Sequence, residues 1–203
     1  MTREILQTYA DAAARLIERY EAISTADLFA PVLPLLPDPP GRVIDVGAGT
    51  GRDAAWFADR GFDVLAVEPV AAFRAAGLAR HRSPRLVWLD DSLPELSRVP
   101  QRGRIFDVVI VNGVWQHVDP AGRRIAMPAI AALTAPGGRL VLSLRHGPGA
   151  PGQLIFEPTV DEAIDLAAAS GFSLVWSEPR ESIQDWNRAA GVTWTWMVFS
   201  RAA

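Results

Sequence analysis

Cysteine is absent from this chain of 203 residues. The absence excludes disulfide bonds, thiolate metal sites and a catalytic thiol. Histidine is scarce as well: His81, His117 and His146 are dispersed, and we expect no metal site. No apolar run reaches the ~18 residues that are needed to cross a bilayer, so we expect no membrane partner. The N-terminus carries charges throughout and lacks the apolar core of a signal peptide, which favours a cytoplasmic location.

An excess of positive charge is also missing. The formal net charge is −3 and the pI is about 5.6, whereas domains that bind nucleic acid through a broad basic face usually have a pI above roughly 9. We therefore expect no nucleic-acid partner. Hydrophobic residues make up 49% of the chain and charged residues 21%, which fits one globular domain with a sizeable core. We expect a monomer or a homodimer.

A glycine-rich turn follows the first strongly apolar segment. Residues 43–46 are mostly apolar, glycines stand at positions 47, 49 and 51, and residues 54–58 have a helix-like composition. This order predicts a strand, a tight turn and a helix. Glycine lets the backbone bend sharply and approach a ligand because it has no Cβ, and the helix start presents unpaired N–H groups. The turn therefore indicates a nucleotide or nucleoside site at the carboxyl end of a strand.

The spacing of the glycines excludes two common nucleotide motifs. A dinucleotide fingerprint would place its third glycine at position 52, which is Arg52, and no Gly-Lys-Ser/Thr of a phosphate loop follows. The D-x-G-x-G-x-G pattern, which begins at Asp45, instead resembles the cofactor loop of class I S-adenosylmethionine-dependent methyltransferases. In that family the loop surrounds the methionine end of the cofactor. The resemblance implies cofactor contacts from Asp45, Gly47, Ala48, Gly49, Gly51 and Arg52.

Acidic residues end the next two expected strands, 62–68 and 86–89. Glu68, followed by Pro69, stands about 20 residues after the glycine turn, where a carboxylate can accept hydrogen bonds from both ribose hydroxyls. The alternative is a strand-end acid that faces water. After the later strand, the resemblance implies an acid that faces the adenine amino group and a backbone N–H that meets a ring nitrogen. The sequence there is Asp90-Asp91-Ser92; either aspartate fits, Asp91 is preferred because it directly precedes Ser92, and capping of a turn is the alternative.

The fourth expected strand, 105–111, is nearly all apolar, which is typical of a strand buried on both faces. Ligands bind outside the carboxyl ends of such strands, near the point where strand order reverses. We therefore expect Asn112, Gly113 and Val114 to line the site where the methyl group leaves the cofactor. Trp115 is a candidate wall of the substrate pocket, with burial in the core as the alternative.

The last third of the chain predicts the topology. Residues 133–140 read Leu-x-x-Pro-Gly-Gly-x-Leu and resemble the family's turn before its fifth strand, here expected at 139–144. A polar loop, 178–191, joins expected strands at 172–177 and 192–200 without a clear crossover helix, which favours antiparallel pairing. The expected fold is α/β, a three-layer Rossmann-like sandwich with a seven-stranded, mostly parallel sheet whose last strand is antiparallel.

The expected organisation is one domain, with residues 1–40 as an N-terminal helical cover and 41–203 as the core. The cover is predicted to contain helices over 2–20 and 25–36, and a further helix over 120–133 is expected to be interrupted near Pro128. The resemblance implies that the cover folds over the cofactor and forms part of the substrate pocket. Tyr9 and Tyr20 could both contact a ligand, and Tyr20 is the candidate substrate contact; the alternative for both is the core, where aromatic residues on a helical stripe usually lie.

The resemblance covers about residues 41–200 and implies methyl transfer from S-adenosylmethionine to a nucleophile, leaving S-adenosylhomocysteine. Because the sulfonium is already an activated leaving group, the protein mainly has to align the reactants. A base is needed only where the acceptor must lose a proton, and His117 and His146 are the candidate catalytic residues because each follows a central strand. The alternative for His117 is a helix-start residue that forms local hydrogen bonds, and for His146 it is a turn residue next to Gly147-Pro148. Arg145 could pair with an anionic substrate or reach solvent.

The small, single-domain architecture favours a small-molecule acceptor, with the choice between oxygen and nitrogen open. The segment 145–158 is rich in glycine and proline and is either a lid or a plain connector. Two other functions stay open. One is a non-catalytic module that binds S-adenosylmethionine; the other is an NAD(P)-dependent reductase, which Arg52 and the antiparallel last strand disfavour.

Overall fold

The computed structural model describes residues 1–149 and 153–203, so part of the segment 145–158 lies outside the described residues. One seven-stranded sheet forms the centre, with the strand order β3-β2-β1-β4-β5-β7-β6. Only β7 runs antiparallel to its two neighbours. The predicted α/β fold is therefore confirmed. The strands are β1 (Arg42–Val46), β2 (Asp63–Val67), β3 (Leu86–Leu89), β4 (Phe106–Val111), β5 (Thr134–His146), β6 (Phe172–Glu181) and β7 (Thr193–Arg201).

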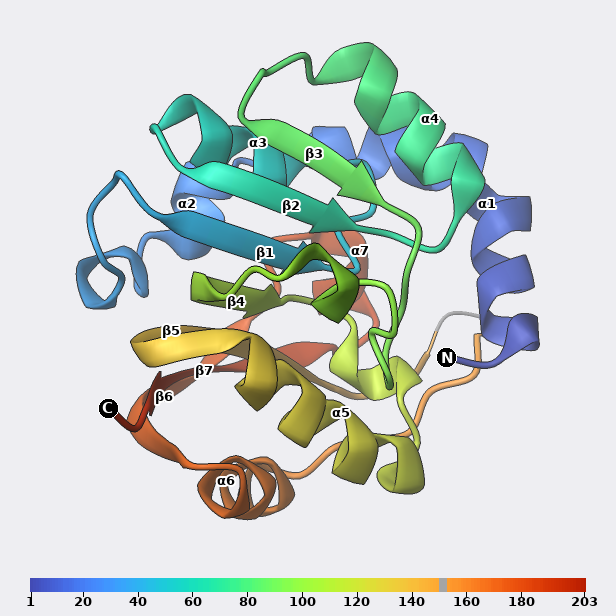
Figure 1. The fold of residues 1–203 in the computed structure, drawn as a ribbon. Helices are drawn as coiled ribbons and strands as arrows, with labels where there is room; N and C mark the ends of the chain where they lie inside the picture. Colours follow the sequence, from blue (N-terminus) through green and yellow to red (C-terminus); the bar gives the residue numbers. More distant parts are fainter. Residues whose placement is uncertain (150–152) are drawn as a thin grey trace.

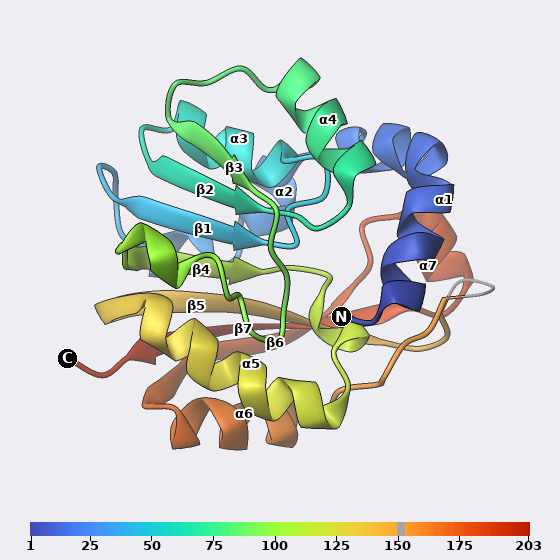
Figure 2. The same ribbon diagram turned by 45° about the vertical axis from the view of Figure 1, so that its right-hand side comes forward.

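Helices cover both faces of the sheet, as Figures 1 and 2 show. One face carries α5 and α6, and α2 and α3 pack on the other. The first helix, α1, packs against α4 beside the carboxyl ends of the strands. The helices are α1 (Arg3–Glu21), α2 (Thr25–Phe29), α3 (Arg52–Asp59), α4 (Ala71–Arg80), α5 (Pro120–Leu133), α6 (Val160–Ala169) and α7 (Asp185–Ala189), with short 3₁₀ turns η1 (Leu33–Leu35), η2 (Pro100–Arg102) and η3 (Trp115–His117).

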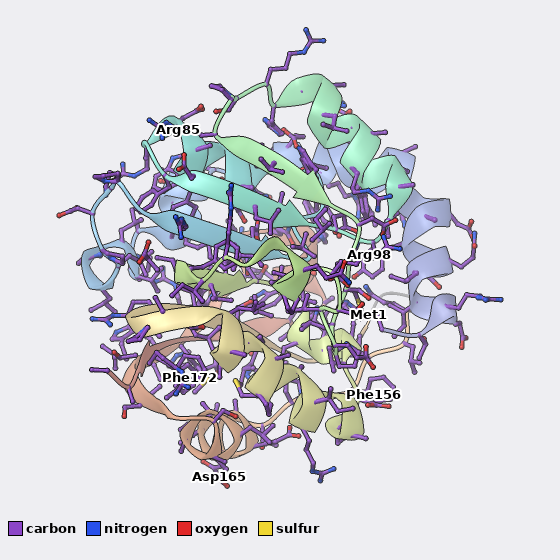
Figure 3. All side chains as sticks on the ribbon, in the orientation of Figure 1. Met1, Arg85, Arg98, Phe156, Asp165 and Phe172 are labelled. Atoms are coloured by element: carbon purple, nitrogen blue, oxygen red, sulfur yellow. The ribbon has the colours of Figure 1, made fainter. Side chains whose placement is uncertain are left out.

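The alternation of side chains along the central strands produces two cores. In β1, Ile44 and Val46 pack toward α5 and α6, while Val43 packs toward α2 and α3. β4 is buried on both faces, as its apolar sequence predicts. The side chains of the whole molecule are drawn in Figure 3. At the carboxyl edge of the sheet, the ammonium group of Met1 donates to the carbonyl of Leu93 and anchors the start of α1.

Four predicted elements differ from the structure. The strand expected at 139–144 already begins at Thr134, so the Pro-Gly-Gly segment expected as a turn lies within β5. The helix expected at 25–36 ends at Phe29 and is followed by η1, because Pro31 has no N–H to continue it. In contrast, α5 runs through Pro128 without a break; both Pro128 and Arg124, four residues earlier, are exposed, so water can satisfy the carbonyl that loses its partner. The loop 178–191 holds the end of β6 and the one-turn helix α7, which connects antiparallel strands and is no crossover.

Candidate functional site

A cavity of about 360 Å³ opens at the carboxyl ends of the central strands. It lies where the strand order reverses at β1, the position at which open α/β sheets bind ligands. Its walls come from α1, the glycine turn, the segments after β2 and β4, the end of β5, and the β6–α7–β7 region. Predicted site residues that line it are Tyr20, Gly47, Ala48, Gly49, Arg52, Glu68, Pro69, Asn112, Gly113, Val114, His117 and Arg145.

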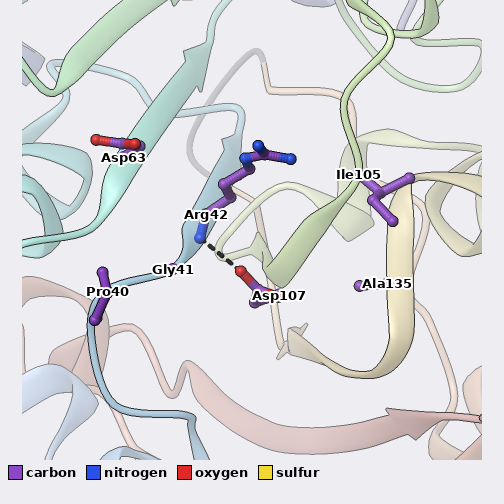
Figure 4. Close-up of a pocket in the computed structure, with 7 residues that line it drawn as sticks. All are labelled: Pro40, Gly41, Arg42, Asp63, Ile105, Asp107 and Ala135. Atoms are coloured by element: carbon purple, nitrogen blue, oxygen red, sulfur yellow. Dashed lines mark hydrogen bonds between the residues drawn. The ribbon is translucent and has the colours of Figure 1, made fainter.

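A shallower hollow lies at the opposite, amino ends of the strands, and Figure 4 shows its lining. There the backbone N–H of Arg42 donates to the carboxylate of Asp107 across 2.7 Å. This bond ties the start of β1 to β4. The hollow contains none of the predicted site residues.

The glycine turn is packed closely against the segment after β4. Gly47 has φ +77°, and a Cβ at this position would lie 2.3 Å from a methyl carbon of Val114. The N–H groups of Gly47 and Ala48 both donate to the carbonyl of Val67, at 2.8 and 3.0 Å. On the other side Tyr20 faces Gly49 at ordinary contact distance. Only glycine fits at position 47, which explains why the motif places it there.

Glu68 joins the second predicted motif to the first. Its Oε2 accepts from the N–H of Gly49 at 2.8 Å, and its Oε1 accepts from the N–H of Val70 at 2.7 Å. The side chain is buried, and this burial raises the pKa of Glu68 to about 7, although the two N–H donors act in the opposite direction. A carboxylate oxygen has two lone pairs, so each oxygen keeps capacity for a hydroxyl donor.

Arg52 connects the N-terminal cover to the glycine turn. Its Nη1 donates to the carbonyl of Tyr20 at 2.6 Å, its Nε to the hydroxyl of Thr25 at 3.2 Å, and its Nη2 to Asp53 at 2.8 Å. The hydroxyl of Thr25 also donates to Asp53 at 2.7 Å. Arg52, which occupies the position of the third glycine in a dinucleotide fingerprint, therefore holds α1 and α2 against α3.

Asp45 and Gly51, the other two residues of the turn motif, lie behind the cavity lining. Asp45 is buried and accepts a hydrogen bond from the backbone of Ala54; burial, and then the charge of Asp53, raises the pKa of Asp45. Gly51 begins α3 at φ +77°, where a Cβ would lie 2.5 Å from the ring of Trp88. Asp45 and Gly51 therefore support the turn on the side that faces away from the cavity.

The acidic pair after β3 does not line the cavity. Asp91 accepts hydrogen bonds from the backbone N–H groups of Ser92, Arg98 and Val99, at 2.9, 2.6 and 3.1 Å, and so closes its own loop. Asp91 therefore has the role that was the alternative to a cofactor contact: it caps the turn of its own loop. Asp90 is paired with Arg74 at 3.2 Å, and Arg74 also donates to the carbonyl of Glu68. Of the two acids, Asp90 is thus the one connected to the ribose candidate.

The segment after β4 is fixed by a small polar network. The hydroxyl of Ser143 in β5 donates to the side-chain oxygen of Asn112 at 2.9 Å and accepts from the N–H of Gly113 at 2.8 Å. The amide nitrogen of Asn112 lies 3.4 Å from Asp53. Trp115 departs from the prediction: its side chain is fully buried in the core under α5 and does not line the cavity, since the η3 turn directs it inward. Its role is packing.

His117 lines the cavity and forms a pair with Tyr9 of α1. Its Nε2 lies 2.8 Å from the Tyr9 hydroxyl, and its Nδ1 lies 3.2 Å from the carbonyl of Leu154. Burial lowers the pKa of His117 to about 4, so the ring is neutral near pH 7. Because a carbonyl can only accept, Nδ1 carries the proton and Nε2 accepts from Tyr9. His146 instead bonds the hydroxyl of Thr195 at 2.9 Å and does not line the cavity.

Arg145 ends in the cavity wall and is 8% exposed. It donates to the carbonyls of Gly147 and Pro148, at 2.9 and 2.6 Å, and burial lowers its pKa. Tyr20 is also held in the lining, where burial raises its pKa to about 12. Of the three predicted substrate contacts, Tyr20 and Arg145 therefore line the cavity.

Several lining residues are not indicated by the sequence, and three of them lie beside the predicted ones: Tyr9, Gln116 and Trp194. Tyr9 lies about one helical turn after the buried Ile5 on the apolar stripe of α1, a position that is typical of a core residue. Gln116 has no motif of its own. Trp194 could have been found from the pairing of β5 with β7, because that register places it opposite Arg145.

Among the described residues, no group of three or more histidine and acidic side chains is arranged to hold a metal ion. Likewise, the helices in residues 1–149 and 153–203 include none that is both long and apolar enough to span a bilayer.

The chain was compared with known families and proteins. The family model described as "Methyltransferase domain" matches residues 18–195. An uncharacterized methyltransferase of Mycobacterium tuberculosis is 38% identical over 108 residues, which cover 53% of this chain and 41% of that protein. A demethylmenaquinone methyltransferase of Beutenbergia cavernae is 29% identical over 157 residues, covering 76% of this chain and 62% of the relative. The chain thus matches less than two thirds of the length of these relatives.

Solved structures share the fold. The 1,6-didemethyltoxoflavin-N1-methyltransferase of Burkholderia thailandensis superposes with a TM-score of 0.73 at 23% identity, covering 98% of this chain and 88% of that one. The magnesium protoporphyrin IX methyltransferase of Synechocystis gives a TM-score of 0.65 at 16% identity, covering 98% and 86%. At these identities the likeness concerns the fold alone.

Proposed function

The chain belongs to the methyltransferase domain family, within the class I S-adenosylmethionine-dependent group, and from this we propose that it methylates an oxygen or nitrogen of a small-molecule acceptor. The observation that carries the proposal is the contact between Gly49 of the glycine turn and Glu68 at the floor of the cavity. The two structures described above hold bound S-adenosylhomocysteine, and the enzyme of Burkholderia thailandensis also holds 1,6-didemethyltoxoflavin.

The residues present fit this cofactor. At Gly47 the place of a Cβ is taken by Val114, so the bare backbone packs on the segment after β4, and both line the part of the cavity to which we assign the methionine end. We assign the rest of this end to Asn112 and Gly113, and the ribose hydroxyls to Glu68. For adenine we propose the segment 90–92, with Asp90 as the side chain and backbone N–H groups as donors. When bound, the cofactor supplies an activated methyl group on a sulfonium.

The pair formed by Tyr9 and His117 supplies the base where the acceptor must lose a proton. The neutral Nε2 of His117 already accepts from the Tyr9 hydroxyl, which is oriented by this bond. The acceptor's proton passes to the Tyr9 oxygen as the Tyr9 proton passes to Nε2, and the carbonyl of Leu154 holds the opposite N–H of the ring. Tyr20 and Arg145 complete the acceptor side of the cavity. His146 lies outside the lining and takes no part in this assignment.

Calorimetry with S-adenosylhomocysteine and with NADH tests the cofactor. We expect saturable binding of the former and none of the latter; the reverse result would identify a reductase. Incubation of the protein with S-adenosylmethionine and candidate acceptors, followed by mass spectrometry, then tests catalysis. Binding without any methylated product or release of S-adenosylhomocysteine would identify a non-catalytic module. We further propose a cytoplasmic protein that acts as a monomer or homodimer without nucleic acid, as its pI of about 5.6 favours.

A further inference from the structure

Arg145 is a buried cation whose counter-charge is missing. Two of its N–H groups donate to backbone carbonyls, and in residues 1–149 and 153–203 no carboxylate forms an ion pair with it. Its other N–H groups form no hydrogen bond in the same part of the chain, and they are not among the side-chain atoms that are fully closed off from solvent, so a ligand can reach them. Taking a charge out of water costs several kcal/mol unless a partner compensates. The backbone carbonyls fix the direction of the guanidinium, and the cavity is the place from which an anion can reach it.

Gln116 is a buried acceptor whose donor is missing. Its side chain is 3% exposed and lines the cavity, and its Oε1 has no hydrogen-bond partner among the described residues. Its Nε2 donates to the carbonyl of Gly113 at 2.7 Å and lies 3.2 Å from Nε2 of His117. An unmet buried oxygen costs about 1–3 kcal/mol. A ligand O–H or N–H placed beside His117 would remove that cost.

Trp194 provides a flat apolar surface next to the cation. In the antiparallel pair of β5 and β7, Arg145 and Trp194 stand directly opposite each other, so their side chains leave the same face of the sheet. The indole lines the cavity and lies near Gly113, where a Cβ would be 3.8 Å from the ring. Such a surface favours a planar ligand, because aromatic faces stack on rings.

We propose that the methyl acceptor is a small planar hydroxy acid, whose carboxylate pairs with Arg145, whose ring lies against Trp194 and whose hydroxyl points toward Gln116 and the Tyr9–His117 pair. This inference rests on the proposed function and names its substrate class. In the bound acid the hydroxyl donates to Oε1 of Gln116. For the transfer its proton turns to the Tyr9 oxygen, and as this O–H bond breaks the Tyr9 proton moves to Nε2 of His117. The new O–CH₃ bond forms as the S–CH₃ bond of the sulfonium breaks, which leaves a neutral thioether.

The test is calorimetry on protein saturated with S-adenosylhomocysteine, with ortho-, meta- and para-hydroxybenzoate as probes. Each is compared with its neutral hydroxybenzamide and with benzoate. We expect at least one hydroxybenzoate to bind roughly tenfold or more tightly than either comparison ligand, a difference of about 1.4 kcal/mol. Equal affinity for acid and amide, or no binding by any of the acids, would overturn the proposal.

Variants distinguish a specific contact of Arg145 with the carboxylate from a general attraction of anions by the positive charges around the cavity. Arg145→Gln should lose the preference for the acid over the amide, and Arg145→Lys should keep part of it. Arg15→Gln is the control, since Arg15 also lines the cavity but is an exposed residue of α1; it should keep the preference. Gln116→Leu should lower affinity for the hydroxybenzoate to that for benzoate. Equal losses in Arg145→Gln and Arg15→Gln would refute the assignment. Retained binding of S-adenosylhomocysteine in every variant leaves the proposed function standing whatever the acids do.

Discussion

The carboxylate of Glu68 accepts a hydrogen bond from the N–H of Gly49 across 2.8 Å, which links the end of β2 directly to the glycine turn after β1. The two residues are neighbours because β1 and β2 pair in parallel with Val46 opposite Val67, so both strands end at the same level. An acid placed at this level stabilises the turn and faces the cavity at once. Its removal should therefore affect both the turn and the ligand.

The first prediction concerns Glu68. Glu68→Ala should weaken binding of S-adenosylhomocysteine by about 1–3 kcal/mol, because two backbone donors and the ribose hydroxyls lose their acceptor. Glu68→Gln keeps one acceptor oxygen and should lose less. Asp63→Asn, at the exposed start of the same strand, is the control and should bind as the unmodified protein does. Calorimetry measures all three, and unchanged affinity in Glu68→Ala would remove the ribose assignment.

The second prediction concerns backbone geometry. Gly47 and Gly103 both have positive φ, +77° and +60°, but a Cβ at Gly47 would meet Val114 at 2.3 Å whereas Gly103 faces open space. Gly103→Ala should cost about 1–2 kcal/mol of unfolding free energy from its left-handed conformation alone. Gly47→Ala adds the cost of overpacking, roughly 1–3 kcal/mol more. Urea denaturation of the two variants measures the difference, and equal losses would contradict the packing of Val114 on the turn.

Features of the fold and site that depend on residues close together in the sequence can be predicted from it, and features that depend on distant segments cannot. The glycine turn, Glu68 and the order of the sheet are encoded in short patterns, because each depends on one strand and the turn that follows it. The role of Trp115 is not local: a tryptophan after a strand can face either a ligand or the core, and α5, which packs over it, decides. The same holds for Asp91, whose partners Arg98 and Val99 lie at the far end of its loop.

Residues of the acceptor side were harder still to predict. Tyr9 and His117 are brought together by the packing of α1 over the carboxyl edge, an arrangement between segments far apart in the chain. The sequence pattern of neither segment indicates that the two are in contact. In contrast, the opposition of Arg145 and Trp194 follows from the register of an antiparallel pair, which two strand boundaries would have supplied.

The third prediction is a pH dependence of stability with two opposed parts in the ligand-free protein. The pKa of Glu68 rises on folding from 4.5 to about 7, so its contribution to stability is present below 4.5 and is lost as the pH rises toward 7. The pKa of His117 falls from 6.5 to about 4, so its contribution is present above 6.5 and is lost as the pH falls toward 4. Between about pH 4.5 and 6.5 the two trends offset each other.

Single variants should expose each trend. Relative to Glu68→Gln, the unmodified protein should lose stability as the pH rises from 4.5 to 7, by roughly 3 kcal/mol at most. Relative to His117→Gln, it should gain stability as the pH rises from 4 to 6.5. Chemical denaturation at a series of pH values gives both difference curves, and a flat curve would show that the corresponding group is not buried as described.

The fourth prediction concerns the N-terminal cover. Because Arg52 bonds the carbonyl of Tyr20, the hydroxyl of Thr25 and the carboxylate of Asp53, Arg52→Gln should release α1 and α2 from α3. Hydrogen exchange should become faster in residues 3–29 and stay slow in β1 and β4.

The control for this variant breaks another contact of the cover. Arg80 pairs with Glu18 between α4 and α1, but its side chain is 40% exposed and that of Glu18 is 74% exposed. Surface pairs of this kind contribute at most about 1 kcal/mol, so Arg80→Gln should leave exchange in α1 nearly unchanged. If both variants open the cover equally, Arg52 has no special part in holding it.

The fifth prediction concerns the base. With an acceptor that must lose a proton, His117→Gln should lower kcat by about 10²–10⁴-fold and leave the affinity for S-adenosylhomocysteine unchanged.

The pH dependence of kcat tests the same assignment. The neighbours of the His117 ring are Tyr9, Gln116 and the cation of Arg145; burial is the main cause that holds the pKa of His117 near 4, and Arg145 adds to it. His117 is therefore already neutral above about pH 5, and kcat at saturating methyl donor should show no inflection near 6.5. Glu68, whose pKa is about 7, should appear instead in the KM for the donor. An inflection of kcat near 6.5 that disappears in His117→Gln would mean that the ring is solvated in the working enzyme, and the relay through Tyr9 would have to be abandoned.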